Sequence, residues 1–267
     1  MPRCTPSIIF TLPLRDFIFS ENRGISLVRN ATIFYTFEPP MKKWKRILFL
    51  RIPLGVVAFS VVLVAVLKYV PIHWTPLMLK RSIEFRDDRK FRTRQAWVPL
   101  EKISGNMEKA VILSEDGSFR SHMGFDFEEM RKMLKEHRKR GTKIRGCSTI
   151  SQQTAKNVFT FCTDTWARKA VEAYWTVLIE LIWGKDRIME VYLNVVEMGR
   201  GIYGIEAASQ FYYGHSCTRL SPAEAAAIAC CLPRPLRRTP HWVMNKRTYK
   251  YRRLLREISN ISEKLSD

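Results

Sequence analysis

The chain has 267 residues, 46% of them hydrophobic, and its 45 Lys and Arg residues against 25 Asp and Glu residues give a formal net charge of +20. This size suits one sizeable globular domain plus an anchor and argues against two domains. The positive excess indicates an anionic partner, which could be nucleic acid, an anionic membrane surface or a diphosphate substrate. Charge alone does not choose among these three.

The first 40 residues show no clear amphipathic period and end in Pro39 and Pro40. Met41 is followed by a basic stretch and then by an apolar segment, an order typical of a natural start that leads into an anchor. We therefore expect translation to begin at Met41, with residues 1–40 a non-native or disordered extension.

An apolar run of 21 residues extends from Ile47 to Leu67, interrupted by one charge, Arg51, near its start. About 20 such residues cross the hydrocarbon core of a bilayer, so residues 41–70 are predicted to form a basic cytoplasmic stretch and a single transmembrane helix. A buried core helix or a cleaved signal peptide fits this length and its flanks less well. The denser basic cluster precedes the run and places the N-terminus in the cytoplasm: Lys42, Lys43, Lys45 and Arg46.

The remaining chain reads as a mainly α domain at residues 99–267, preceded by a stalk at residues 71–98 that is rich in charge and proline. Two capping boxes, Thr149 with Gln152 and Ser221 with Glu224, mark helix starts, and Asp186 is predicted to cap another helix. Apolar spacing and breakers predict helices over residues 100–116, 127–140, 149–159, 166–183, 186–196, 221–232 and 247–265.

The six cysteines show no spacing typical of a zinc site. Export would permit a disulfide between Cys147 and Cys162, although no bridge can be assigned from sequence. Cys230 and Cys231 fall in an alanine-rich helical run, where small buried thiols are expected.

Three clusters of residues could carry chemistry, and the first is Glu115 with Asp116 at the end of an apolar helix. Adjacent acids on a helix point about 100° apart, so one can face a cleft while the other anchors the following loop. A partly desolvated carboxylate is a better base, which makes Glu115 a candidate general base. Taken alone, the pair could equally be a solvated helix end.

The second cluster opens the helix at residues 149–159. Ser148, the free amides of the helix start and Lys156 together could seat a diphosphate, with Gln152 and Gln153 beside them. Gln152 and Lys156 are four residues apart and share a helix face. Ordinary capping plus a solvated lysine would produce the same pattern.

The third cluster is Arg168, Lys169 and Glu172. Arg168 and Glu172 also share a face at a spacing of four, which is usually only a surface ion pair. That face continues through Trp175 and Ile179, however, and an apolar stripe beside an ion pair is unusual for pure surface.

In their residues and in their order along the chain, these clusters resemble the motifs of the family 51 glycosyltransferases, the peptidoglycan polymerases with a lysozyme-like helical fold. The likeness covers about residues 100–240 and is closest to the short monofunctional members, because little sequence follows it and no Ser-x-x-Lys of a transpeptidase is present. The motifs that carry it are Glu115-Asp116 with Phe119, His122 and Gly124-Phe125-Asp126; Gly146-x-Ser148-Thr149-Ile150-x-Gln152-Gln153 with Lys156-Asn157; Arg168-Lys169-x-x-Glu172; Lys185-Asp186-Arg187-Ile188-Met189-Glu190-x-Tyr192-Leu193-Asn194; Gly201-Ile202-Tyr203-Gly204; Tyr213-Gly214; Leu220-Ser221-x-x-Glu224-Ala225-Ala226; and Leu232-Pro233-x-Pro235.

The resemblance implies an enzyme of peptidoglycan biosynthesis, and hence of cell-wall biogenesis and cell shape, in the bacterial cytoplasmic (inner) membrane with its catalytic domain outside. The donor would be a growing glycan on undecaprenyl diphosphate and the acceptor lipid II, joined by a β-1,4 linkage. Other cell-wall synthesis proteins would be its partners, and nucleic acid would not. No tightly bound cofactor is implied, although a divalent metal, Mg or Mn, is compatible with the chemistry.

The same resemblance assigns roles to the site residues. Glu115 would be the general base, and Glu172 would either assist the leaving group or hold the cationic cluster and any metal in place. The diphosphate would be neutralised by Lys156, Arg168 and Lys169, while its oxygens would be positioned by Ser148, Gln152 and Gln153. Asp164 stands where members of the family often carry a basic residue, which removes one expected contact to the diphosphate.

Two other functions must be separated from this one. A lysozyme-like glycan-cleaving enzyme needs a carboxylic acid with a raised pKa, and a cationic cluster beside such an acid would act in the opposite direction. A membrane-tethered basic binding protein would depend on its basic residues and not on its carboxylates. Assaying lipid II polymerisation separates all three.

Overall fold

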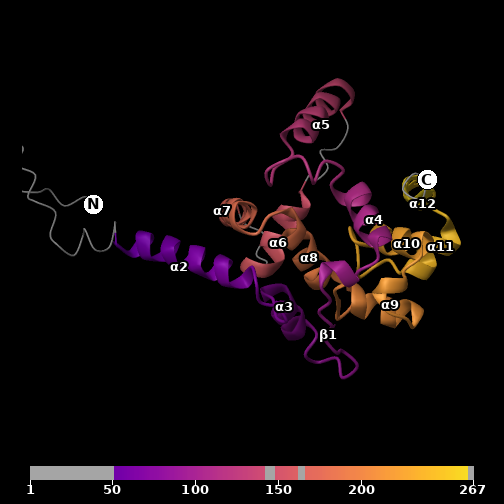
Figure 1. The fold of residues 1–267 in the computed structure, drawn as a ribbon, viewed down its shortest axis with the longest axis horizontal. Coiled ribbons are helices and arrows are strands. Elements are labelled where there is room, and N and C mark those ends of the chain that lie inside the picture. Colours follow the sequence, from indigo (N-terminus) through magenta and orange to yellow (C-terminus); the bar gives the residue numbers. More distant parts are fainter. Residues whose placement is uncertain (1–50, 142–147, 162–165, 264–267) are drawn as a thin grey trace, which may run out of the picture. The chain divides into compact units, whose positions relative to one another are not determined.

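A computed structural model describes residues 51–141, 148–161 and 166–263, which fall in two compact units, 1–58 and 59–267 (Figure 1). The predicted extension at residues 1–40, the start at Met41 and the basic cluster at 42–46 lie outside the described residues. Cys147, Cys162 and Asp164 also lie outside them, so the structure bears on neither the disulfide nor the missing basic residue.

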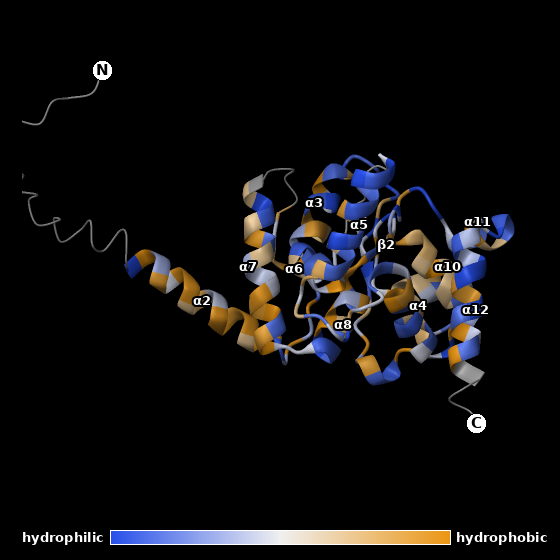
Figure 2. Ribbon diagram, turned by 90° about the horizontal axis from the view of Figure 1, so that it is seen from above, coloured by the Kyte–Doolittle hydropathy of each residue, from blue (hydrophilic) through white to orange (hydrophobic). Residues whose placement is uncertain are grey.

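The apolar run forms helix α2, Ile52–Leu67, which Figure 2 colours mostly as hydrophobic. Its side chains are mostly exposed. Residues 47–50 of the predicted span precede the described part of the chain. Across the described ranges, no helix combines the length and the hydropathy needed to cross a membrane. The last turns of α2 belong to the second unit, in which the Trp183 indole donates to the carbonyl oxygen of Val64 at 2.7 Å and Arg187 donates to that of Leu67 at 2.8 Å.

Part of the predicted stalk is folded helix. The hydroxyl of Thr75 accepts from the amide of Met78 and begins α3, Pro76–Glu84. Met78 is fully buried, and α3 packs against α6. The burial of Met78 therefore gives this segment a place in the core that its proline-rich sequence did not indicate.

The mainly α prediction for the domain is confirmed, and both capping boxes form as expected. Gly141 ends α5 in the left-handed conformation, as its position predicts. The helices of the domain are η2 (Leu100–Lys102), α4 (Gly105–Glu115), α5 (Phe127–Arg140), α6 (Ile150–Phe159), α7 (Trp166–Ile182), α8 (Lys185–Val195), α9 (Ile205–Tyr213), η3 (Cys217–Arg219), α10 (Pro222–Cys231), α11 (Pro240–Lys246) and α12 (Tyr249–Glu263).

Three predicted helices start differently in the structure. The segment 100–116 is a short 3-10 helix, η2, followed by α4, which begins at Gly105. Gly184, not Asp186, occupies the N-cap of α8, and the Asp186 carboxylate instead accepts a hydrogen bond from Arg120. The predicted last helix, 247–265, is α12, which begins two residues later because Arg247 adopts a left-handed conformation at φ 44° and the Thr248 hydroxyl accepts from the amide of Tyr251. Helices α9 and α11 were not predicted.

A small sheet was not predicted. Its strands β1 (Arg94–Gln95), β2 (Glu197–Gly199) and β3 (Ile202–Tyr203) lie in the order β1-β3-β2, with β1 parallel and β2 antiparallel to β3. Strands of two or three residues are too short to show alternation, so sequence periodicity could not find them.

The core is centred on the alanine-rich helix α10. Residues 225–231 are all buried, and the helix contacts α4, α11 and α12. Cys230 and Cys231 are buried free thiols, as expected. Because the small side chains of α10 let α4 approach closely, Glu115, the last residue of α4, is held in a fixed position. Helix α6 packs against α7 and α8.

Candidate active site

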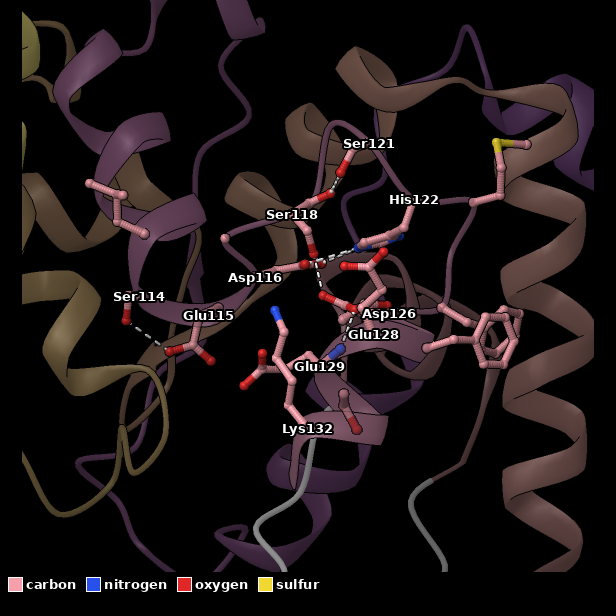
Figure 3. A pocket seen from close by; sticks show the side chains of 17 residues that line it. Ser114, Glu115, Asp116, Ser118, Ser121, His122, Asp126, Glu128, Glu129 and Lys132 are labelled. Carbon is pink, nitrogen blue, oxygen red and sulfur yellow. Dashed lines mark hydrogen bonds and ion pairs between the residues drawn. The ribbon is translucent and has the colours of Figure 1, made fainter. Parts of the chain in front are cut away.

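A cleft of about 770 Å³ opens where α4 ends, bounded by the following loop, the start of α5 and the residues that begin α6. In Figure 3 the Glu115 carboxylate and the Lys132 ammonium point into it from α4 and α5. In Figure 1 helix α5 stands apart from the other helices, and none of its residues is buried. The cleft is strongly acidic, with carboxylates from Glu115, Asp116, Asp126, Glu128 and Glu129.

Glu115 is the last residue of α4, and its side chain is 12% exposed. One carboxylate oxygen, Oε1, lies 3.0 Å from the Ser114 hydroxyl and 3.5 Å from the Lys250 ammonium. The other, Oε2, lies 3.4 Å from the Gln153 amide nitrogen. The contacts are long for a carboxylate, so the group retains capacity to accept a proton.

Asp116 has a different task. Its oxygens accept from the Ile150 amide at 2.9 Å and contact the His122 ring nitrogen Nε2 at 2.9 and 3.0 Å. It therefore joins the loop to the first turn of α6, where free amides favour a negative charge. The adjacent acids divide the work as their geometry suggested, with Glu115 facing the cleft and Asp116 anchoring the loop.

Gly124 lets this loop lie close to α7. Its φ is +80°, and a Cβ there would be 2.8 Å from the Thr176 methyl carbon. Its carbonyl oxygen accepts from the Thr149 hydroxyl at 2.6 Å, which fixes the loop to the start of α6. Only glycine satisfies both the backbone conformation and the close approach.

The two predicted glutamines have different environments. Gln152 closes the capping box, with its side-chain oxygen accepting from the Thr149 amide at 3.0 Å, so it serves the helix start. Gln153 instead donates to Glu115 and, at 3.3 Å, to the carbonyl oxygen of Ser148, which also lines the cleft. Gln153 thus brings two of the predicted site residues together.

Tyr192 supports Gln153 from α8. Its hydroxyl donates to the side-chain oxygen of Gln153 at 3.3 Å. Complete burial, reinforced by the charges of Glu115 and Asp116, holds the pKa of Tyr192 well above its usual value. The phenol therefore stays a neutral donor and keeps the Gln153 amide turned toward Glu115.

Lys156 is half-buried one turn further along α6. Among the residues that the structure describes, no hydrogen bond or ion pair is made by its ammonium group. A cation held on a rigid helix without a carboxylate partner of its own is suited to an anionic ligand.

The third cluster lies on α7 and is centred on Glu172, whose side chain is only 2% exposed. One of its oxygens is 3.0 Å from Arg168 and the other is 2.9 Å from Lys169, which is itself 49% exposed. Ile179 on the same face is fully buried and Trp175 packs against the core, so the predicted apolar stripe is present.

The structure therefore joins some predicted site residues by direct contact and others by helix packing only. Glu115, Gln153 and Ser148 form one group, and Arg168, Lys169 and Glu172 another. The second group lies on α7, and helix α6 packs against α7, with Phe159 and Trp175 stacked at 4.3 Å between ring centroids.

Sequence reasoning missed two residues that contact the site. Tyr192 lies within a quoted motif, so its position carried a signal that we left unassigned. Lys250 is 135 residues from Glu115 on a strongly basic helix, where one lysine among many cations has no sequence signal.

No three His, Cys, Asp or Glu side chains of the described residues converge so as to hold a metal ion. Asp116 is occupied by the Ile150 amide and His122, and Asp126 by the Glu129 amide and the Ser118 hydroxyl. Both carboxylates are therefore engaged by groups of the protein.

The chain also compares closely with known proteins. A family model described as Transglycosylase matches residues 81–259. The biosynthetic peptidoglycan transglycosylase of Chromohalobacter salexigens is 49% identical over 183 residues, 68% of this chain and 78% of its own length. That of Bacteroides thetaiotaomicron is 48% identical over 181 residues, 67% of this chain and 73% of its own length. That of Caulobacter vibrioides is 47% identical over 199 residues, 74% of this chain and 83% of its own length. With the matched residues including every member of the cleft and of the α7 cluster, the chain belongs to the transglycosylase family.

Proposed function

We propose that this transglycosylase polymerises lipid II into β-1,4-linked glycan and releases undecaprenyl diphosphate. Membership of the family and the names of its relatives support a peptidoglycan glycosyltransferase. The observation that carries the proposal is the placement of Glu115 at the end of a helix packed against the core, with its carboxylate open to a cleft large enough for a sugar acceptor.

In this reaction the 4-hydroxyl oxygen of lipid II attacks the anomeric carbon of the donor glycan. A new C–O bond forms there while the bond from that carbon to the diphosphate oxygen breaks, and the bonding electrons leave with the diphosphate. Glu115 takes the hydroxyl proton as the oxygen becomes nucleophilic. Attack opposite the leaving group inverts an α-linked donor and gives the β linkage.

The leaving diphosphate needs charge neutralisation, which we assign to Lys156, Arg168 and Lys169. Ser148 and Gln153 orient the reacting groups at the cleft, and Gln152 acts through the helix start that it caps. Glu172 holds Arg168 and Lys169 in position. The Glu172 side chain is buried, with cationic nitrogens at 3.0 and 2.9 Å from its two oxygens.

We further propose that the apolar segment anchors the enzyme in the cytoplasmic (inner) membrane by a single pass, with the N-terminus inside and the catalytic domain outside. The 21-residue apolar run, its basic N-terminal flank and the exposed apolar side chains of α2 support this. A reporter fused after Asp267 should be active only if it works outside the cytoplasm, and activity of a cytoplasm-only reporter would overturn the topology.

The activity is tested with purified protein in detergent and labelled lipid II, with products separated on a gel. A ladder of polymer is expected. Release of fragments from finished glycan without polymer would support a cleaving enzyme, and charge-dependent binding alone would support a binding protein. EDTA in the same assay tests whether Mg or Mn is required, and other cell-wall synthesis proteins can be added to identify partners.

A further inference from the structure

Lys250 reaches from α12 to the end of α4. Its ammonium nitrogen lies 3.3 Å from the carbonyl oxygen of Ser114 and 3.5 Å from Oε1 of Glu115. The Lys250 side chain is 36% exposed, so this contact sits at the rim of the cleft and not deep in the core. A residue far along the chain thus touches the proposed base directly.

The start of α12 and its packing set the position and direction of the Lys250 side chain. The left-handed turn at Arg247 and the Thr248 cap set where α12 begins. Buried side chains then fix the helix against α10 and α4, and they recur at helical spacing: Tyr251, Leu254, Leu255 and Ile258. Lys250 is one residue before Tyr251 and four before Leu254, so it lies at the edge of this buried stripe and faces α4.

The other groups around Glu115 are neutral or negative on most sides. Tyr192 on α8 is a neutral phenol, and burial raises the pKa of the Cys230 thiol on α10. Asp116 is the adjacent residue and is in contact with His122. Across the cleft stand Asp126, Glu128, Glu129 and Lys132. Among the described residues, Lys250 is therefore the cation in direct contact with Glu115.

The two carboxylate oxygens of Glu115 therefore differ in their contacts. Oε1 receives both the Ser114 hydroxyl and Lys250, whereas Oε2, among the described residues, receives the long contact from Gln153. We propose that Lys250 is a positioning residue that holds Oε1, so that Oε2 faces the acceptor hydroxyl and takes its proton. This inference rests on the proposed function of Glu115 as the general base.

A purely structural role is the main competitor, because a cation that binds the last carbonyl groups of α4 also stabilises that helix end. The two roles differ in their response to pH. Removing a cation beside a carboxylate favours the protonated form, which cannot act as a base. A lost helix cap would lower stability without moving the pH–rate profile.

The test compares Lys250→Met and Lys250→Arg with wild type in full-length protein, using lipid II polymerisation from pH 5 to 9. For Lys250→Met we expect kcat to fall roughly 10-fold to 100-fold with KM within about twofold, because geometry and charge at the base are lost while donor contacts remain. The acidic limb of the kcat profile should move to higher pH, and Lys250→Arg should restore most of both. Arg253→Met is the matched control, since it removes a cation of the same helix that pairs with Glu257 and not with Glu115.

A second measurement separates action through Glu115 from direct substrate binding. In a Glu115→Gln background, Lys250→Met should cause little further loss, whereas an independent substrate contact would cost the same factor again. An unshifted pH profile with equal kcat in Lys250→Met, or full additivity with Glu115→Gln, would overturn the inference. Failure of the wild type to make polymer would instead overturn the proposed function itself, so the two failures are distinguishable.

Discussion

The two glutamates expected to act in catalysis occupy contrasting environments. Glu115 is 12% exposed at the mouth of a cleft, with contacts of 3.0 to 3.5 Å from three different helices or helix ends. Glu172 is 2% exposed, and both of its cations come from its own helix at 3.0 and 2.9 Å. The carboxylate of Glu115 can still receive a proton from a ligand, whereas that of Glu172 is paired with Arg168 and Lys169.

This contrast shows that residue type and motif do not assign a catalytic role by themselves. A general base must reach the proton that it abstracts, which Glu115 can do and Glu172 cannot without rearrangement. A buried carboxylate between two cations instead fixes them relative to one another. We therefore expect the two glutamates to respond differently to the same substitution.

The largest expected effect is at Glu115. Glu115→Gln keeps the shape of the side chain and removes its basicity, so polymerisation should fall by roughly 10²–10⁴-fold. Lipid II binding and the melting temperature should be nearly unchanged, because the Ser114 and Gln153 contacts can be re-formed with an amide. Measured rates on labelled lipid II check this, and a near wild-type rate would show that the base is another residue.

Glu172→Gln should act mainly on stability. Removing one partner of a buried ion pair leaves uncompensated charge, and we expect a loss of about 3 kcal/mol, near the low end for such changes because Lys169 is half exposed. Denaturant unfolding measures this loss. If stability were unchanged while activity fell as far as in Glu115→Gln, Glu172 would have a chemical role and the contrast drawn above would fail.

Lys156→Ala should affect substrate binding as well as turnover, and its effect should be smaller than the effects of Glu115→Gln and Glu172→Gln. If the charge of Lys156 contacts the donor diphosphate in both ground and transition states, as proposed above, KM should rise and kcat should fall, each by about tenfold. Lys156→Arg should recover part of the loss. Lys246→Ala, an exposed lysine on α11, is the control that should change neither constant.

Local sequence signals predicted the helix starts of this fold well and its long-range contacts poorly. The capping boxes at Thr149 and Ser221 formed as expected, because each depends only on residues three apart. Helix α11 was missed because its seven residues are too few to show an apolar period, although Thr239 caps it and Pro240 opens it.

The same distinction applies to the site. Glu115 and Gln153 could be named from their motifs, but only packing shows that Gln153 contacts the base whereas Gln152 caps a helix. Lys250 could not be named at all, because its contact depends on how α12 packs against α4. Chemistry carried by a contiguous motif is thus readable from sequence, and chemistry completed by tertiary contact is not.

The smallest expected effect concerns the wall of the cleft opposite Glu115. The Glu129 amide, together with the Ser118 hydroxyl, holds the pKa of Asp126 below its usual value, and Asp126 is the N-cap of α5. Because α5 has no buried residue, this cap is a large share of what keeps its first turn in place. Asp126→Ala should therefore weaken the start of α5 by about 1 kcal/mol.

The direction of the Asp126 pKa shift determines how the stabilisation by this N-cap depends on pH. A carboxylate whose pKa is lowered in the folded state stabilises it fully above the unfolded value of about 3.9, and the contribution disappears as pH falls through the folded value. Wild type and Asp126→Ala should thus differ by a constant amount from about pH 5 to 8 and converge as pH falls through the lowered pKa of Asp126 in the folded state. Amide exchange in the first turn of α5, with the buried helix α10 as internal reference, measures the difference, since exchange in α10 should be the same in both proteins. Equal protection of α5 in the two proteins at neutral pH would show that the loop from Ser118 to Asp126, and not the cap, holds this wall of the cleft opposite the base.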